Sequence, residues 1–74
     1  MANQNQRSHD VFRVYSRALE TARAGIRSGF TNRRILFRNT AWLAHCERGS
    51  LQLLDAHMLA LEATREALRE VAAK

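Results

Sequence analysis

The residues with the most chemical potential in this chain are its three histidines and its single cysteine. His45 and Cys46 are neighbours, whereas His9 and His57 lie well away from them in the sequence. Adjacent residues on a helix project about 100° apart, so His45 and Cys46 are poorly placed to bind one metal ion together. Cys46 falls on an apolar stripe, which favours a small buried side chain over a nucleophile. With no glycine-rich phosphate loop and no paired-carboxylate motif, the sequence predicts a protein that is not an enzyme and holds no metal or intrinsic cofactor.

Arginine is the other residue type that could carry a function. Twelve basic residues against seven acidic ones give a net charge of +5, and every basic residue except Lys74 is an arginine. Residues 1–38 hold eight arginines against two acids, whereas residues 39–74 hold four basic residues against five acids. Arginine pairs with carboxylates and phosphates in two-point geometry. A basic surface on the first half of the chain therefore has three open interpretations: a solvated face, a site for an acidic protein, or a site for nucleic acid.

Helices must position these arginines. The chain has no proline and only three glycines, and its apolar residues recur every three or four positions, as in an all-α protein. We expect an antiparallel three-helix bundle with helices at about 9–28, 32–48 and 51–73. Residues suited to capping and turns mark the boundaries. They are Ser8 or Asp10, then Gly29 with Thr31 or Asn32, then Gly49 with Ser50.

Each expected helix carries an apolar stripe. The first stripe consists of Val11, Phe12, Tyr15, Ala18, Leu19, Ala22 and Ile26. The second consists of Ile35, Leu36, Trp42, Leu43 and Cys46, widened by Phe37, Ala41 and Ala44, and the third of Leu51, Leu54, Met58, Leu61, Leu68 and Ala72. Alternatively, Gly49 only weakens a helix that runs continuously through the second and third segments, because one glycine costs about 1 kcal/mol in a helix. Such an arm would have to dimerise to cover its stripe.

A chain of 74 residues makes a single small domain, which we expect at 8–74 after a flexible polar leader at 1–7. One cysteine allows no internal disulfide, so a partner surface is the expected source of extra stability. No segment reaches the length of apolar sequence that spans a bilayer, and the start MANQNQRSHD lacks the apolar core of a secretory signal. We therefore expect a soluble protein.

The segment VFRVYSRAL at residues 11–19 resembles the opening of the LYR-motif proteins, which are small mitochondrial three-helix accessory and assembly factors. Where the family reads Leu-Tyr-Arg, this chain has Val14, Tyr15 and Ser16. The tyrosine matches, the valine is a conservative change, and the serine replaces the motif arginine. Arg13 and Arg17 stand close to that position and could compensate for it.

A second segment, RILFRN at residues 34–39, is similar to the Arg-x-x-Phe-Arg-x-Asn element on the family's second helix. Arg34, Phe37 and Arg38 match, and Asn39 comes one position early. A leucine-rich third helix also agrees with the family, so the resemblance covers nearly the whole chain.

The resemblance implies a noncatalytic adaptor in the mitochondrial matrix that binds acylated acyl carrier protein and joins a larger assembly, such as a respiratory complex or a mitoribosome. The acidic helix of the carrier would meet basic side chains, and its acyl-phosphopantetheine arm would insert among the three helices. The residues implied for carrier binding are Arg13, Arg17, Arg34 and Arg38. Those implied for the acyl chain, or for ordinary core packing, are Val14, Tyr15, Leu36 and Phe37.

Two other classes of function stay open. The first is a cytoplasmic bacterial or phage regulatory or inhibitory protein, a helical dimer that covers the surface of another protein. Its self-association seam would be Leu54, Met58, Leu61 and Leu68. The second is a basic nucleic-acid-binding module, whose affinity would fall steeply with salt. The aromatic side chains fall mainly on expected packing faces, so an acidic protein is favoured over nucleic acid.

Overall fold

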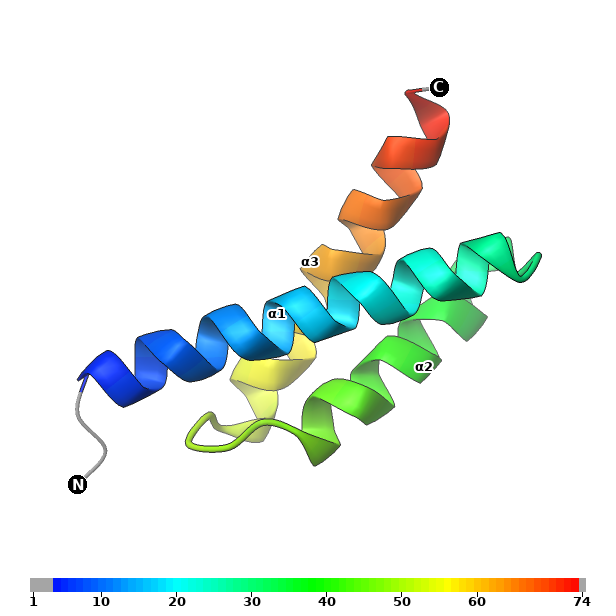
Figure 1. The fold of residues 1–74 in the computed structure, drawn as a ribbon. Helices are drawn as coiled ribbons and strands as arrows, with labels where there is room; N and C mark the ends of the chain where they lie inside the picture. The colour runs from blue at the N-terminus through cyan, green and yellow to red at the C-terminus, as the bar shows by residue number, and fades with distance from the viewer. Residues whose placement is uncertain (1–3, 74) are drawn as a thin grey trace.

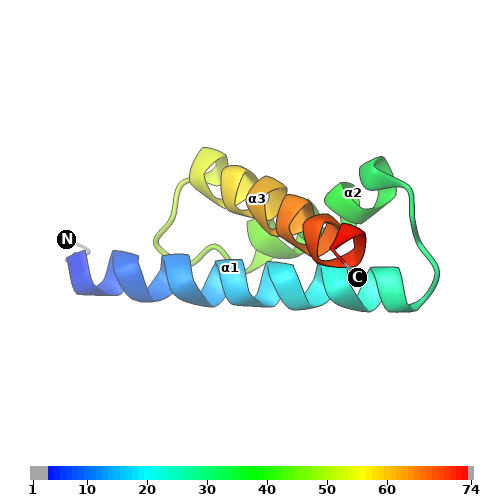
Figure 2. The ribbon, with the colours of Figure 1, turned by 90° about the horizontal axis from the view of Figure 1, so that it is seen from above.

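Residues 4–73, which the computed structural model describes, form three helices: α1 (Gln4–Arg27), α2 (Arg33–Cys46) and α3 (Leu53–Ala72). Each helix packs against both others, which confirms the expected all-α three-helix bundle. α2 returns along α1 in the opposite direction, and α3 crosses both obliquely (Figure 1). Seen from above, the first turns of α1 project beyond the other helices (Figure 2). No helix within residues 4–73 is long and apolar enough to cross a membrane.

The two turns between the helices depend on glycines with positive φ. Gly29 has φ 97° after the end of α1, and the side chain of Asn32 then caps α2 by accepting from the backbone N–H groups of Arg34 and Ile35. Gly49 has φ 59° and separates α2 from α3, so the alternative of one continuous helix is wrong. Ser50 does not cap α3, since the capping position is Gln52, whose side chain makes no capping hydrogen bond.

The expected start of the first helix is also wrong, because α1 begins at Gln4 and contains Ser8 and Asp10 within it. Contacts of its first turns with the rest of the protein explain the extension. Gln6 hydrogen-bonds to Asp10, and Arg7 forms an ion pair with Asp55 of α3. Residues 4–7 thus belong to the helix, while residues 1–3 of the expected leader lie outside the described residues.

The core is built mainly from small side chains. α3 faces inward with alanines and a threonine, which are at most 1% exposed. That threonine, Thr64, forms a buried hydrogen bond to Thr40 of α2, with the two Oγ1 atoms 2.9 Å apart. Small residues let helices approach closely, and the packing of α3 follows from this. The core residues are Val14, Ala18, Ala22, Leu36, Ala41, Ala44, Leu51, Ala56, Ala60, Ala63 and Ala67.

Several residues of the expected stripes lie on the surface instead of in the core. Phe12 and Trp42 are each 73% exposed, and Cys46 is exposed at the end of α2. On α3, Leu54 and Met58 are 68% and 51% exposed. Apolar spacing alone placed these residues inside, but the alanines beside them give the closer helix contacts and occupy the core.

Candidate functional site

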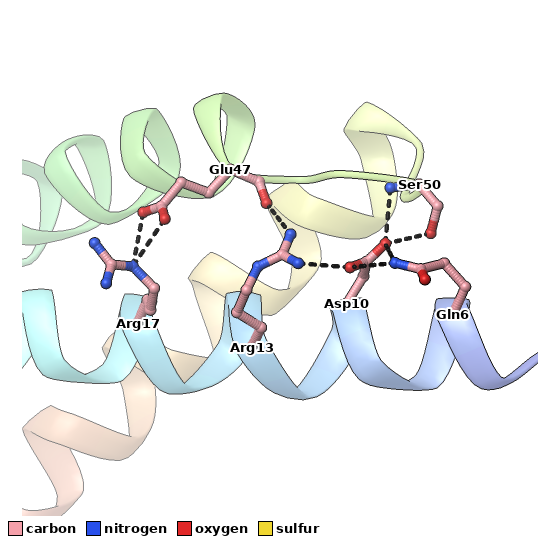
Figure 3. A network of polar contacts seen from close by, with 6 residues as sticks. All are labelled: Gln6, Asp10, Arg13, Arg17, Glu47 and Ser50. Atoms are coloured by element: carbon pink, nitrogen blue, oxygen red, sulfur yellow. Dashed lines mark hydrogen bonds and ion pairs between the residues drawn. The ribbon is translucent and has the colours of Figure 1, made fainter.

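Two of the arginines proposed as partner contacts lie in a polar network between α1 and the turn that joins α2 to α3 (Figure 3). Arg13 donates from Nη1 to Asp10 Oδ1 and from Nη2 to the carbonyl oxygen of Glu47, both at 2.6 Å. Arg17 Nε lies 2.8 Å and 2.9 Å from the two carboxylate oxygens of Glu47. Arg13 thus satisfies a carbonyl at the C-terminus of α2, where a positive charge is favourable.

Asp10 is the buried centre of this network. It is 1% exposed, and its Oδ2 accepts hydrogen bonds from the backbone N–H of Ser50 at 2.9 Å and from the Ser50 hydroxyl at 2.5 Å. These two hydrogen bonds outweigh the opposing effect of burial and lower the pKa of the Asp10 carboxyl far below its ordinary value, and Gln6 and Arg13 add smaller lowering contributions. The carboxylate thus holds the turn at Ser50, which is remote from Asp10 in the sequence. No local sequence motif predicts this structural function.

The turn also needs glycine at position 49. A Cβ atom there would lie 2.9 Å from Asp10 Oδ2 and 2.9 Å from Arg13 Nη2. Such distances are too short for ordinary contacts, so a side chain at position 49 would displace Asp10 or Arg13 from the network. Arg13 and Arg17 therefore have clear structural functions within the chain.

The remaining arginines fall into two groups. Arg7 pairs with Asp55, Arg23 with Glu70, Arg65 with Glu62, and Arg69 with both Glu66 and Glu62. By contrast, five exposed arginines have no side-chain hydrogen bond or ion pair to any residue of the described part of the chain. They are Arg27, Arg33, Arg34, Arg38 and Arg48.

Four of these five arginines lie around the turn between α1 and α2, and we call Arg27, Arg33, Arg34 and Arg38 the arginine end. Arg34 and Arg38 are four residues apart on α2, so they project from neighbouring turns on the same side of the helix. The fifth, Arg48, lies beyond the opposite end of α2. Charge that the fold does not use internally is thus concentrated at one end of the molecule, where it is available to an anionic partner.

The residues proposed for an acyl chain divide into two pairs. Val14 and Leu36 are at most 2% exposed and belong to the core. Tyr15 and Phe37 are half-buried and lie in different surroundings, since Phe37 makes an edge contact with His57 at a centroid distance of 4.9 Å. Tyr15 instead lines an open groove of about 470 Å³ between α1 and α3, together with Val11, Phe12 and Leu59. The apolar space beside Tyr15 is therefore on the surface.

The histidines are less scattered than their positions in the sequence suggest. The rings of His45 and His57 stack between α2 and α3 with centroids 5.6 Å apart, and His45 Nε2 is buried with no hydrogen-bond partner among residues 4–73. Nevertheless, no three histidine, cysteine or carboxylate side chains within residues 4–73 come together as metal ligands. The pair is best described as part of the packing between two helices.

The outer side of α3 carries the residues that the sequence marks as a self-association seam. Leu54 and Met58 are exposed, while Leu61 and Leu68 are partly exposed farther along the helix. The exposed Trp42 and Phe12 lie on other helices and were missed as surface residues, because apolar periodicity does not distinguish a core face from an outer face.

No protein-family model matches this chain, and no curated protein and no solved structure matches it significantly.

Proposed function

We propose that this protein is a noncatalytic helical adaptor that binds an acidic partner protein through its arginine end. One observation carries the proposal: Arg34 and Arg38 are exposed, lie one helical turn apart and have no carboxylate partner among the described residues. Most other arginines are paired with acids of the chain itself. Guanidinium groups held on one side of a helix suit the carboxylates of a facing acidic helix.

Acylated acyl carrier protein is the partner that we propose first, in the mitochondrial matrix. The resemblance of residues 11–19 and 34–39 to the LYR-motif proteins supports this choice, and a three-helix fold agrees with it. The internal contacts of Arg13 and Arg17 change the assignment of residues, because those side chains already contact Asp10 and Glu47. The carrier contacts are therefore assigned to Arg34 and Arg38. Arg13 and Arg17 are assigned to contacts within the bundle.

The test is co-expression with a bacterial acyl carrier protein followed by native mass spectrometry and a binding titration of the purified components. We expect a one-to-one complex that carries the additional mass of an acylated phosphopantetheine. Arg34→Glu or Arg38→Glu should weaken binding at least about tenfold, since each replaces an attraction by a repulsion. Arg48→Glu is the matched control, because Arg48 is equally unpaired but lies beyond the other end of α2.

Equal losses in all three variants would mean that the carrier responds only to net charge, and unchanged affinity in Arg34→Glu and Arg38→Glu would refute the assignment. Circular dichroism of each variant checks that helicity is retained. Competition with a mixed-sequence RNA oligonucleotide separates the remaining class of function. An RNA complex that forms in preference to the carrier complex would contradict the proposed protein partner.

A further inference from the structure

The outer face of α3 carries a strip of large side chains that the fold leaves uncovered. We define the strip as Leu54, Met58, Leu61, Arg65 and Leu68. We propose that this strip binds a second copy of the same chain in antiparallel orientation, so that the protein forms a homodimer through α3. This inference is independent of the proposed binding of an acidic partner.

The spacing of the strip is that of a coiled-coil seam. Its members are separated by four, three, four and three residues, and leucine recurs at every seventh position from Leu54 through Leu61 to Leu68. This pattern describes a face that packs against another helix along its whole length. Within the protein, however, α3 uses a different face for that purpose, the buried alanines Ala56, Ala60, Ala63 and Ala67.

The exposure of the strip indicates that no part of residues 4–73 covers it. Leu54 is 68% exposed and Met58 is 51% exposed, and Leu61 and Leu68 are only half-buried. Arg65 does not break the seam, because its aliphatic stem can pack on a facing leucine while its guanidinium remains beside Glu62 at the edge. An apolar strip of this length on a small chain is a typical site of protein association.

The charges beside the strip favour a second copy of this chain. Asp55, Glu62 and Arg69 follow one another at seven-residue intervals along one edge, acidic toward the start of α3 and basic toward its end. An antiparallel pair places Asp55 of each copy near Arg69 of the other and the two copies of Glu62 near each other, so two opposite-charge contacts and one like-charge contact form by symmetry. Within one chain Asp55 is paired with Arg7 and Arg69 with Glu66, so both side chains would take part in contacts within and between the copies. In a parallel pair the positions facing this edge are His57, Thr64 and Val71, of which Thr64 is buried within the bundle and none carries a carboxylate or a guanidinium.

Sedimentation of the purified chain at several concentrations tests the dimer. We expect a reversible monomer–dimer equilibrium, with the dissociation constant raised at least about tenfold by Leu54→Glu and by Met58→Glu, because each introduces a charge into the seam of both copies. Both side chains are exposed in the single chain, so the helicity of the variants should be unchanged. Trp42→Glu is the matched control, since Trp42 is at least as exposed but lies on α2. A chain that remains monomeric, or a dimer that only Trp42→Glu disrupts, would overturn the proposal.

Disulfide trapping tests the orientation in a Cys46→Ser background, which removes the native thiol. In the antiparallel register that pairs Asp55 with Arg69, the two copies of Glu62 face each other near the centre of the contact. Glu62→Cys should therefore form a covalent dimer on mild oxidation, while Leu54→Cys, at one end of the strip, should not. Linkage through Leu54→Cys, or no linkage through Glu62→Cys in a chain that still dimerises, would overturn the antiparallel arrangement.

Discussion

At the scale of single residues, the fold depends on one buried carboxylate whose partners lie on α1 and in the turn between α2 and α3. Asp10 receives hydrogen bonds from Ser50, Arg13 and Gln6, and it is the only residue among those described that joins the start of α1 to the turn before α3 in this way. A buried ionised group is stable only when its hydrogen-bonding capacity is filled, and these contacts fill it. The ionised form is therefore favoured in the folded protein.

The lowered pKa of Asp10 gives a definite pH dependence of stability. In the unfolded chain the carboxyl takes up a proton as the pH falls below about 4, whereas in the folded protein it stays ionised to lower pH. The free energy of unfolding should thus be steady near neutral pH and decline below about pH 4. Asp10→Asn should be less stable than wild type at pH 7, and this gap should narrow in acid, as measured by urea unfolding between pH 7 and pH 3. A gap that is constant over this range would contradict the role of the charge.

The sequence correctly predicted that the Asp10 carboxylate accepts a backbone N–H, but it predicted the wrong N–H. A carboxylate near the expected start of a helix reads as a cap for that helix, and Asp10 does accept a backbone N–H. That N–H belongs to Ser50, and nothing local to residue 10 encodes a contact with a turn so distant in the chain. The assignment of Asn32 as a cap is confirmed because its target lies within three residues. Local polar contacts could be predicted, whereas those created by helix packing could not.

At the scale of elements, α3 shows why the presence of a helix was easier to predict than its buried face. Its periodicity predicted a helix close to the observed range, but both its leucine strip and its alanine face have helical spacing. The choice between these faces depends on how closely α1 and α2 can approach, which is a property of the assembled bundle. Because large side chains signal hydrophobicity more strongly than alanine, the leucine strip was the predicted core face, although the alanine face is the buried one.

The inward alanine face leads to a prediction for core volume. Ala60 is fully buried between helices, so Ala60→Leu forces additional methyl and methylene groups into a close contact. We expect it to lower the free energy of unfolding by about 1–3 kcal/mol, the usual cost of overpacking. Met58→Ala, at a position 51% exposed on the same helix, should cost well under half as much in dilute monomer. Urea unfolding of both variants makes the comparison, and an equal or larger loss in Met58→Ala would contradict the observed orientation of α3.

At the scale of the whole molecule, a bundle of 74 residues with an alanine-rich core leaves both charge and apolar surface available for other molecules. Ion pairs join α1 to α3 near both ends of the contact, through Arg7 with Asp55 and Arg23 with Glu70. These pairs neutralise basic side chains of α1, so four of the five arginines without a partner among the described residues lie around the turn between α1 and α2. The net charge could be predicted from the sequence, but its concentration at one end follows from which acids the fold brings to which arginines.

A small core also makes the stability of this protein responsive to association. If the folded chain pairs through α3, its thermal midpoint must rise with concentration, because mass action stabilises the associated native state. Across a hundredfold increase from below the dimer dissociation constant, we expect a rise of about 4–8 °C, corresponding to roughly 1 kcal/mol per chain for a domain of this size. Leu54→Glu should remove this dependence while leaving the midpoint of the dilute protein nearly unchanged, since Leu54 is 68% exposed in the single chain. Calorimetry at matched concentrations measures both effects. A wild-type thermal midpoint that does not change with concentration would contradict the dimer through α3.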